Sequence, residues 1–529
     1  MHPSGALSDT FAAQWEGVCS IRRLLSMEAQ PPVEEVLKCG ILARLVHLLA
    51  TSQHPKLQFE ACWAITNIAS TEHTRAVVDA GAVAPLVAGM MSADAELREQ
   101  SIWCVGNIAG DCARFRDLVL ATPNVLNALL TNLQNPSSIT LLRNATWTLS
   151  NFCRGKPSPS EEQVKAMVPA LAWLLINGTD RDVVQDAAWG LSYLTDGPQA
   201  TVQAVLDAPG VVARCVALMG HSEATMTVPA LRVIGNFICG SDTQTQAACD
   251  AGALGALLPL LTHPRRNIKR EAAWAVSNVA AGTSEQLAAV MAQPGLMDAV
   301  VSLLRKGETT DWNVRKEAAW VVSNVATVGA ARHGEALLEL GVVVPLADLL
   351  SSTQDHRILS VVLDAVGAML SMSHRGAAAP HLSAKSIADK FEEAGLVDAL
   401  EHLQTFVPDD VNEKVIKILQ QHYPEEEGTV EDEGGEEEGA YRGAGAAAGG
   451  FAWGAPSSSA AAAGSAFGSA FGSAGALSAV SSNAAPGSIV PMFGFGAQPA
   501  AAAPSCAAGA GAFPSATPQH FSFTGMSFT

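Results

Sequence analysis

One pattern of apolar and polar residues recurs along most of the chain. Its clearest copies read ACWAITNIAS, SIWCVGNIAG, ATWTLSNFCR and AAWAVSNVAA, in which apolar and small residues flank a tryptophan and an asparagine. The copies are centred on Trp63, Trp103, Trp147, Trp189, Arg232, Trp274 and Trp320, and a faded copy places Asp364 at the same position. Successive centres lie 40, 44, 42, 43, 42, 46 and 44 residues apart. Copies in such register do not arise by chance, so the chain is built from an internal repeat.

A second pattern follows the first and predicts a corner between two helices. It reads VVDAGAVAPLV at residues 77–87, ACDAGALGALLPLL at 248–261 and LLELGVVVPLADLL at 337–350. In each stretch one helix ends, glycine turns the chain, and an apolar helix begins. Glycine suits this stop because it adopts the left-handed conformation without steric strain. One repeat therefore reads as a short helix, a longer helix and a third helix that bears the tryptophan.

This period is typical of armadillo and HEAT repeats, which have two or three helices each. No such repeat buries its apolar faces alone, so neighbouring repeats must stack into a superhelix with a concave inner surface. We expect an all-α fold, an armadillo-repeat right-handed superhelical solenoid of about ten repeats with a disordered C-terminal tail.

The predicted boundaries follow the changes in composition. They are 1–16 for a short N-terminal segment, 17–423 for the armadillo-repeat domain, 424–439 for an acidic segment and 440–529 for the tail. Residues 17–50 and 383–423 read as atypical first and last repeats. The run from Glu425 to Glu438 holds nine carboxylates, which is typical of a solvated segment. The tail has one charged residue, Arg442, amid Ala, Gly and Ser, so it cannot bury enough surface to fold.

Composition narrows the functional classes. The formal charge of −19 disfavours nucleic acid and favours a cationic partner. The ten cysteines lack zinc-type spacing and read as small buried hydrophobes of a reducing compartment, as at Cys62, Cys104 and Cys153. We expect no membrane span, since no run of about twenty apolar residues occurs, and no secretory signal peptide. With no phosphate loop, metal cluster or Ser/His/Asp set, we expect no enzyme and no cofactor.

The tryptophan and asparagine of the repeated pattern point to a peptide-binding surface. They stand four residues apart in the pairs Trp63/Asn67, Trp103/Asn107, Trp147/Asn151, Trp274/Asn278 and Trp320/Asn324. Residues with this spacing share one face of a helix. Parallel indoles from adjacent repeats leave slots for the stem of a Lys or Arg, whose charged head interacts with the rings. An asparagine amide binds both N–H and C=O of an extended peptide.

A structural interpretation competes with this one: each tryptophan fills the core, and each asparagine caps a helix. A buried tryptophan, however, does not need an asparagine one turn later. Asparagine is also unfavourable in the middle of a helix. We therefore favour the interpretation in which both residues face outward along a groove.

Carboxylates near these pairs are candidates for selecting basic side chains. Asp111 lies just past the second pair, and Glu271 and Glu317 each lie three residues before a tryptophan. Each is placed to meet a lysine ammonium, although a solvated charge at a helix end explains these residues equally well.

The ladder of pairs is interrupted in its middle. Trp189 is followed by Tyr193, and the next copy has Arg232 followed by Asn236. An arginine at a tryptophan position repels a basic side chain. The interruption splits the groove into two basic-peptide sites joined by a linker region, one from Trp63 to Asn151 and one from Trp274 to Asn324.

These features resemble the importin-alpha (karyopherin-alpha) family over about residues 15–440. The stretches that carry the resemblance are RNATWTLSNFCRGKPSPS, ALRVIGNFICGSDTQTQ, LSYLTDGP and NIAGDCARFRDLVL. The resemblance implies a nuclear import adaptor that binds lysine- and arginine-rich nuclear localisation signals and links cargo to importin-beta for passage through the nuclear pore. It also implies shuttling between cytoplasm and nucleus, and recycling by an export receptor with Ran-GTP.

The resemblance further implies residue roles. The major site would consist of Trp63, Asn67, Thr74, Trp103, Asn107, Asp111, Asn144, Trp147 and Asn151. The linker region would be lined by Trp189, Tyr193 and Asp196. The minor site would consist of Arg232, Asn236, Glu271, Trp274, Asn278, Glu317, Trp320 and Asn324.

Both ends of the chain bear on this resemblance. Family members begin with a basic segment that binds importin-beta and folds back onto the groove, whereas here Arg22 and Arg23 already belong to the first repeat. A truncated chain, a gene model without one exon and a member without the segment are all open. At the other end FGSAFGS, MFGFG and HFSFTGMSFT resemble the Phe-Gly tails of plant-type members. The tail is either an inert extension or a contact for nuclear-pore proteins.

Two alternatives come from other functional classes. A catenin-like armadillo scaffold should line its groove with Lys, Arg and His for acidic ligands, and here the corresponding positions carry Trp and Asn with acidic neighbours. A pore-associated protein without import activity would use the Phe-Gly tail as its working part. Deletion of residues 440–529 separates this alternative from an adaptor, whose peptide binding should survive the deletion.

Overall fold

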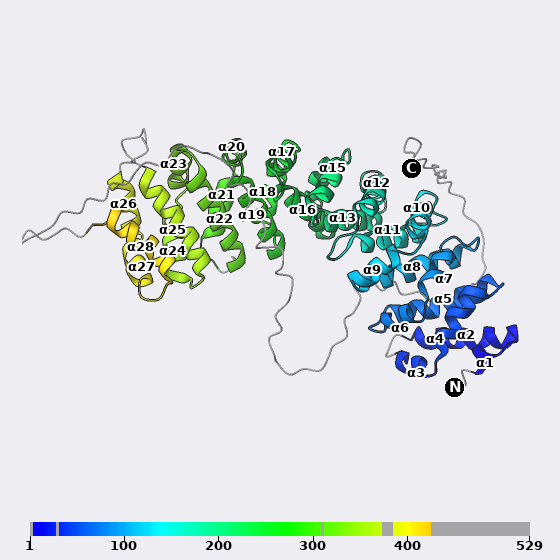
Figure 1. Ribbon diagram of the computed structural model, residues 1–529. Helices are drawn as coiled ribbons and strands as arrows, with labels where there is room; N and C mark the ends of the chain where they lie inside the picture. Colours follow the sequence, from blue (N-terminus) through cyan, green and yellow to red (C-terminus); the bar gives the residue numbers. More distant parts are fainter. Residues whose placement is uncertain (1–3, 28–30, 306, 308–310, 373–383, 425–529) are drawn as a thin grey trace, which may run out of the picture. The chain divides into compact units, whose positions relative to one another are not determined.

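The computed structural model describes residues 4–27, 31–305, 307, 311–372 and 384–424, which all belong to one compact unit. Helices follow one another along the chain (Figure 1), and no strand occurs among the described residues. The all-α prediction is therefore confirmed. The predicted acidic segment, apart from Pro424, and the predicted tail at 440–529 lie outside the described residues.

The helices fall into consecutive sets of three. Each set begins with a short first helix: α3 (Val33–Lys38), α6 (Thr74–Asp79), α9 (Ala113–Leu120), α14 (Gln199–Leu206), α17 (Asp242–Asp250), α20 (Ser284–Ala292), α23 (Ala331–Glu339) and α26 (Ala384–Glu393). The second helices are α4 (Ile41–Thr51), α7 (Val83–Gly89), α10 (Val125–Gln134), α15 (Val211–Met219), α18 (Ala253–Leu261), α21 (Leu296–Leu304), α24 (Val343–Ser352) and α27 (Leu396–Leu403).

The third helices carry the repeated tryptophan position. They are α5 (Pro55–Ala69), α8 (Ala95–Asp111), α11 (Ile139–Cys153), α13 (Arg181–Thr195), α16 (Ala224–Ile238), α19 (Arg266–Ala280), α22 (Trp312–Val328), α25 (His356–Leu370) and α28 (Asp409–His422). Before α13 a single helix, α12 (Glu161–Asn177), replaces the usual first and second helices. The described array thus agrees with the predicted sequence of short, longer and third helix in all repeats but this one.

Two helices occupy the region around the predicted boundary at residue 17. Helix α1 (Ser4–Leu7) and helix α2 (Phe11–Leu25) lie partly or wholly in the stretch expected to precede the repeats. Helix α2 packs against the third helix α5, as one third helix packs against the next. At the two positions that correspond to the repeated tryptophan and asparagine, this part of the chain has Arg22 and Ser26.

Glycine forms the corner between first and second helices, as predicted. Gly81, Gly252 and Gly341 have φ of 77°, 88° and 76°, in the left-handed region. An added Cβ at these positions would meet nothing within 4 Å, so the backbone conformation alone demands glycine. Asn124, with φ of 67°, takes the same place before α10, and asparagine is the residue that best tolerates this conformation after glycine. Helix α12 has no glycine at the corresponding point and continues through it.

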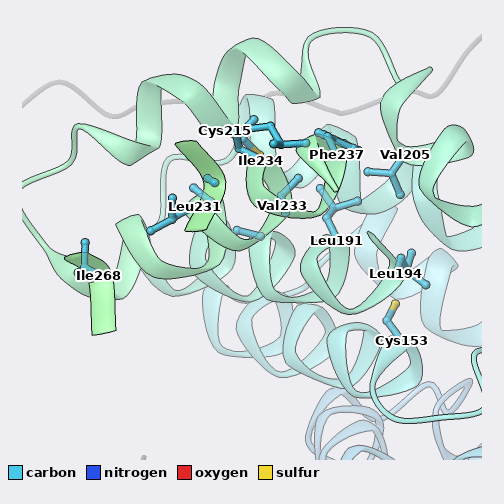
Figure 2. Packing of buried hydrophobic residues seen from close by; sticks show 14 of the residues in the cluster. Cys153, Leu191, Leu194, Val205, Cys215, Leu231, Val233, Ile234, Phe237 and Ile268 are labelled. Carbon is cyan, nitrogen blue, oxygen red and sulfur yellow. The ribbon is translucent and has the colours of Figure 1, made fainter. Parts of the chain in front are cut away.

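Stacking of neighbouring repeats forms one continuous hydrophobic cluster. Third helices contact each other in chain order, and most second helices do the same. Figure 2 shows part of this core, to which α13 contributes Leu191 and Leu194 and α16 contributes Ile234 and Phe237. Since each repeat covers the apolar face of the next, the array positions a series of third helices side by side.

The cysteine interpretation is only partly right. Cys62, Cys104 and Cys153 are buried as predicted, and burial raises the pKa of the Cys62 thiol to about 12. Cys39 and Cys112, in contrast, are exposed at helix ends. Composition could not show this, because the corners and the ends of a helix expose residues that an apolar run would bury.

Candidate peptide-binding face

Seven consecutive third helices, α5 to α22, carry the predicted tryptophan and asparagine positions on one face. Trp103 is 41% exposed, and the other tryptophans of the pattern are also partly exposed. Between Trp103 and Asn107, the side chains of Cys104 and Val105 are buried. The tryptophans therefore point away from the core. We call this surface the ladder face and define it by Trp63, Asn67, Trp103, Asn107, Trp147, Asn151, Trp189, Tyr193, Arg232, Asn236, Trp274, Asn278, Trp320 and Asn324.

The asparagines on this face are oriented by the preceding repeat. The Nδ2 of Asn324 donates to the carbonyl oxygen of Ser277 at 2.9 Å, and the Nδ2 of Asn151 donates to that of Gly106 at 3.2 Å. Asn236 likewise donates to the Oγ1 of Thr195 at 3.0 Å. An amide has two N–H donors and an accepting oxygen, so one donor fixes the side chain and the rest of the amide keeps its bonding capacity.

Two more asparagines donate to side chains of the preceding repeat, and two differ in how their amides are buried. Asn67 donates to the Oγ of Ser26 at 2.9 Å, and Asn278 donates to the Sγ of Cys239 at 3.1 Å. The Nδ2 of Asn107 is buried and has no acceptor in the part of the chain that the structure describes. Asn151 is itself only 5% exposed, so its amide is less open than the outward-facing interpretation expected.

Small residues let the indoles lie close to the preceding helix. Gly106, one residue before Asn107, has the ring of Trp147 so near that an added Cβ would lie 2.5 Å from its Cζ3 atom. Gly235, one residue before Asn236, stands in the same relation to Trp274, at 2.6 Å. Each of these indoles therefore rests on the backbone of the repeat before it.

Some carboxylates on this face are already paired with cations of the chain. Glu271 forms an ion pair with Arg232, and Asp196 forms one with Lys156 at 3.1 Å. Glu60 accepts two hydrogen bonds from Arg22, at 2.7 and 3.1 Å. Glu271 is buried, whereas Arg232 is exposed. A peptide cation could reach Glu271 only in competition with Arg232.

Other carboxylates have no Lys or Arg within ion-pair distance in the described ranges. They are Glu99, Asp186 and Glu317. Burial raises the pKa of Asp186 to about 7, assisted by the negative charges of Asp182 and Asp180. Burial also raises the pKa of Glu317 to about 7, against the opposing effect of Arg270 and Lys316. These groups are poised to gain from a cation that restores their charged form.

The remaining residues of the expected major site lie in different surroundings. Asp111 is exposed at the end of α8. Thr74 is 2% exposed, and its hydroxyl donates to the carbonyl oxygens of Ala69 and Thr71 at 2.9 Å. Asn144 is partly exposed and lies 3.4 Å from the Oε1 of Glu99. Thr74 therefore serves the corner between α5 and α6 in this structure.

The linker region has a stacked aromatic pair. The rings of Trp189 and Tyr193 lie 5.8 Å apart with an interplanar angle of 25°. Burial raises the pKa of the Tyr193 hydroxyl. The stacking fills the place where the other repeats have an asparagine amide, so the linker region offers aromatic surface instead of a backbone-binding group.

Sequence reasoning missed several residues on this face. The guanidinium of Arg22 lies 4.5 Å from the ring centroid of Trp63, and Lys156 reaches Asp196 from the loop after α11. Glu99 and Asp186 were missed as well. Extending the repeat backward would have found Arg22, because Arg22 and Ser26 each lie 41 residues before the first tryptophan and asparagine.

Metal-binding clusters and membrane-spanning helices are two other features that would bear on function. No group of three or more His, Cys, Asp or Glu side chains that could hold a metal occurs among the described residues. In the same residues no single helix is long and apolar enough to cross a membrane, although two bent pairs, α14 with α15 and α20 with α21, meet the length and composition criteria together.

Comparison with known proteins identifies the repeats. The armadillo/beta-catenin-like repeat family matches residues 29–70, 70–110 and 241–281. The crystal structure of an engineered protein superposes with a TM-score of 0.69 and 28% sequence identity, covering 79% of this chain and 97% of that one. The armadillo-repeat prediction is confirmed.

Two plant proteins resemble the chain over most of its length. Importin subunit alpha-1b of Oryza sativa subsp. japonica is 41% identical over 426 residues, which cover 79% of this chain and 78% of that protein. Importin subunit alpha-4 of Arabidopsis thaliana is 40% identical over 434 residues, covering 81% and 79%.

Proposed function

The chain belongs to the importin-alpha family, and from this premise we propose that it is a nuclear import adaptor that binds basic nuclear localisation signals on its ladder face. The observation that carries the proposal is the row of partly exposed indoles, each one turn from an amide or aromatic side chain, on consecutive third helices. A surface of this kind can hold an extended chain and select its cationic side chains.

The major site is proposed to bind the principal basic cluster. The indoles of Trp63, Trp103 and Trp147 flank the stems of lysine or arginine, at about 0.5–1 kcal/mol for each exposed cation–π contact. Asn67, Asn107 and Asn151 bind the peptide backbone with the amide groups that the preceding repeat leaves available. Asp111 and Asn144, with Thr74 at the adjoining corner, complete the site.

The minor site is proposed to bind a second basic cluster. Trp274 and Trp320 supply its indoles, Asn278 and Asn324 its backbone contacts, and Glu317 its open carboxylate. Arg232, Asn236 and Glu271 lie at its edge, and the Arg232–Glu271 ion pair limits how far a cationic side chain can extend in that direction. Trp189, Tyr193 and Asp196 contact the spacer between clusters.

Charge supports a cationic ligand. The chain has a formal charge of −19, and Glu99, Asp186 and Glu317 lack a cation of their own in the described ranges. The overall field would accelerate encounter with a basic peptide. A bound lysine or arginine would then stabilise the ionised form of these carboxylates.

The proposal extends to the transport cycle. The protein would link cargo to importin-beta, pass with it through the nuclear pore, and shuttle between cytoplasm and nucleus. An export receptor with Ran-GTP would return it, and nuclear-pore proteins are further proposed partners. Membership of the importin-alpha family supports these steps.

Binding of a labelled lysine-rich localisation peptide, followed by fluorescence anisotropy, tests the proposal. We expect micromolar or tighter binding, lost mainly in Trp103→Ala/Asn107→Ala and less in Trp320→Ala/Asn324→Ala. Phe406→Ala is a matched control, because Phe406 is an aromatic side chain with the same 41% exposure as Trp103 and lies between α27 and α28, outside the helices that carry the ladder face. A protein that is helical by circular dichroism and binds no peptide would contradict the adaptor function. A loss in Phe406→Ala equal to that in the major-site variant would contradict the site.

A further inference from the structure

The first repeat places an arginine where the next four repeats have a tryptophan. Arg22 of α2 lies 41 residues before Trp63, and Ser26 stands in the same relation to Asn67, to which it is hydrogen-bonded. Helices α2 and α5 pack against each other as consecutive third helices do. Arg22 therefore stands at the end of the ladder face, beside its first indole.

The side chain of Arg22 has the surroundings proposed for a cation of the peptide. Its guanidinium carbon lies 4.5 Å from the ring centroid of Trp63. Its Nε and Nη2 donate to the two carboxylate oxygens of Glu60, at 2.7 and 3.1 Å. The Arg22 and Glu60 side chains are 18% and 10% exposed, so the pair is well shielded from water. One face of an indole and one carboxylate are thus occupied by the chain itself.

We propose that Arg22 is an end stop of the major site and determines where a bound basic peptide must end. This inference rests on the proposed function and adds to it a residue that sets the length and register of the ligand. A peptide lysine beyond Trp63 would have to displace Arg22 from both partners. Arg22 is covalently held at this place, so it competes at a high effective concentration. The bidentate hydrogen bonds to Glu60 make the displacement still less favourable.

Arg232 shows that a cation at a tryptophan position does not by itself produce this arrangement. Arg232 also forms an ion pair, with Glu271, but its side chain is 44% exposed compared with 18% for Arg22. The more shielded Arg22 is the one that covers an indole of the major site.

Peptides that differ at one position test the end stop. A short basic core peptide is extended at either end by one residue, lysine or alanine, and the Kd of each form is measured by fluorescence anisotropy. For the wild type we expect the lysine and alanine forms to bind equally at the end that reaches Trp63. For Arg22→Ala we expect the lysine form to bind about 3- to 10-fold more tightly than the alanine form, since the indole and Glu60 become available.

Two further variants separate the proposal from a purely structural role. Arg22→Gln keeps a hydrogen-bonding stem beside Glu60 without the charge, and should show the same new preference if Arg22→Ala fails to fold. Arg23→Ala is the matched control, because Arg23 is the exposed neighbour and its removal changes the net charge equally. Its lysine-to-alanine ratio should equal that of the wild type.

The outcomes distinguish this inference from the proposed function. If the core peptide binds and the lysine-to-alanine ratio is unchanged in Arg22→Ala and Arg22→Gln, the end stop is wrong and the adaptor function stands. A preference for lysine at both ends already in the wild type, or an equal gain in Arg23→Ala, also overturns it. If the wild type does not bind the core peptide, both proposals fail.

Discussion

Replacing Gly106 by alanine should disturb the ladder face without removing any group proposed to bind peptide. Gly106 lies within α8, and the ring of Trp147 from the next repeat rests against it. A Cβ at this position would lie 2.5 Å from Cζ3 and 2.9 Å from Cε3 of that ring, and would also clash with Thr148. The indole would have to move by about 1 Å to reach an ordinary carbon–carbon separation.

The same position of a later repeat provides the control. Gly367 lies three residues after Asp364, as Gly106 lies three residues after Trp103. Its added Cβ would be 3.7 Å from the nearest atom of Ile418, which is an ordinary contact. The two substitutions therefore change the same helix position and differ in the space around it.

Both substitutions share one stabilising effect on the folded state, and only Gly106→Ala has a packing cost that opposes it. Alanine in place of glycine inside a helix favours folding by about 0.5–1 kcal/mol, which should be the full effect of Gly367→Ala. At Gly106 this gain is opposed by an overpacking cost of about 1–3 kcal/mol. The free energy of unfolding of Gly106→Ala should thus lie about 1–3 kcal/mol below that of Gly367→Ala.

Urea unfolding followed by circular dichroism measures this difference, and peptide anisotropy measures its effect on the site. Because a repeat array can unfold in more than one step, entire unfolding curves are compared rather than a single midpoint. If the partly exposed indole swings outward, the stability loss will be small and peptide affinity will fall instead. Equal stability of the two variants together with equal peptide affinity would refute the packing argument.

Three further predictions concern charge. Peptide affinity should rise with pH through neutrality and level off at higher pH. The reason is that Asp186 has a pKa of about 7 in the free protein and a bound cation would lower that pKa, so that binding releases a proton. Anisotropy titrations should show a flatter pH profile for Asp186→Asn. Arg116→Ala should lower the free energy of unfolding by about 3 kcal/mol or more, because the buried guanidinium donates to three carbonyl oxygens of the 154–157 segment. Arg114 is exposed, so Arg114→Ala should stay within about 0.5 kcal/mol of wild type when both variants are measured by urea unfolding. Peptide affinity should fall as salt shortens the Debye length from about 10 Å at 0.1 M to about 3 Å at 1 M, and a salt-independent Kd would contradict the electrostatic part of the site.

The sequence alone was sufficient for the repeats and for the helix face that carries the repeated tryptophans. The period of the Trp-centred phrase predicted the stacked helical array, and the four-residue spacing of Trp103 and Asn107 placed both on one face. Glycine at positions such as Gly252 predicted the corners. These are local properties, because helical periodicity and the left-handed conformation depend on a few neighbouring residues.

Some expectations could be corrected only from the tertiary structure. The pattern could not show that Thr74 is buried at a corner or that Asn151 is nearly covered by the preceding repeat. It also could not show that α2 begins at Phe11 and packs against α5. In each case the surroundings of the residue include another helix. The spacing of residues along one helix does not show what that other helix contributes.

Pairing of charges was decided by the tertiary structure as well. Arg22 meets Glu60 across 38 residues, and Arg232 meets Glu271 across 39, because stacking brings consecutive third helices together. The same stacking leaves Asp186 and Glu317 without a cation of their own in the described ranges. Sequence therefore determined which residues share a helix face. Only the packing of one repeat on the next decided which of their charges are already neutralised, because that depends on distances between side chains of different repeats.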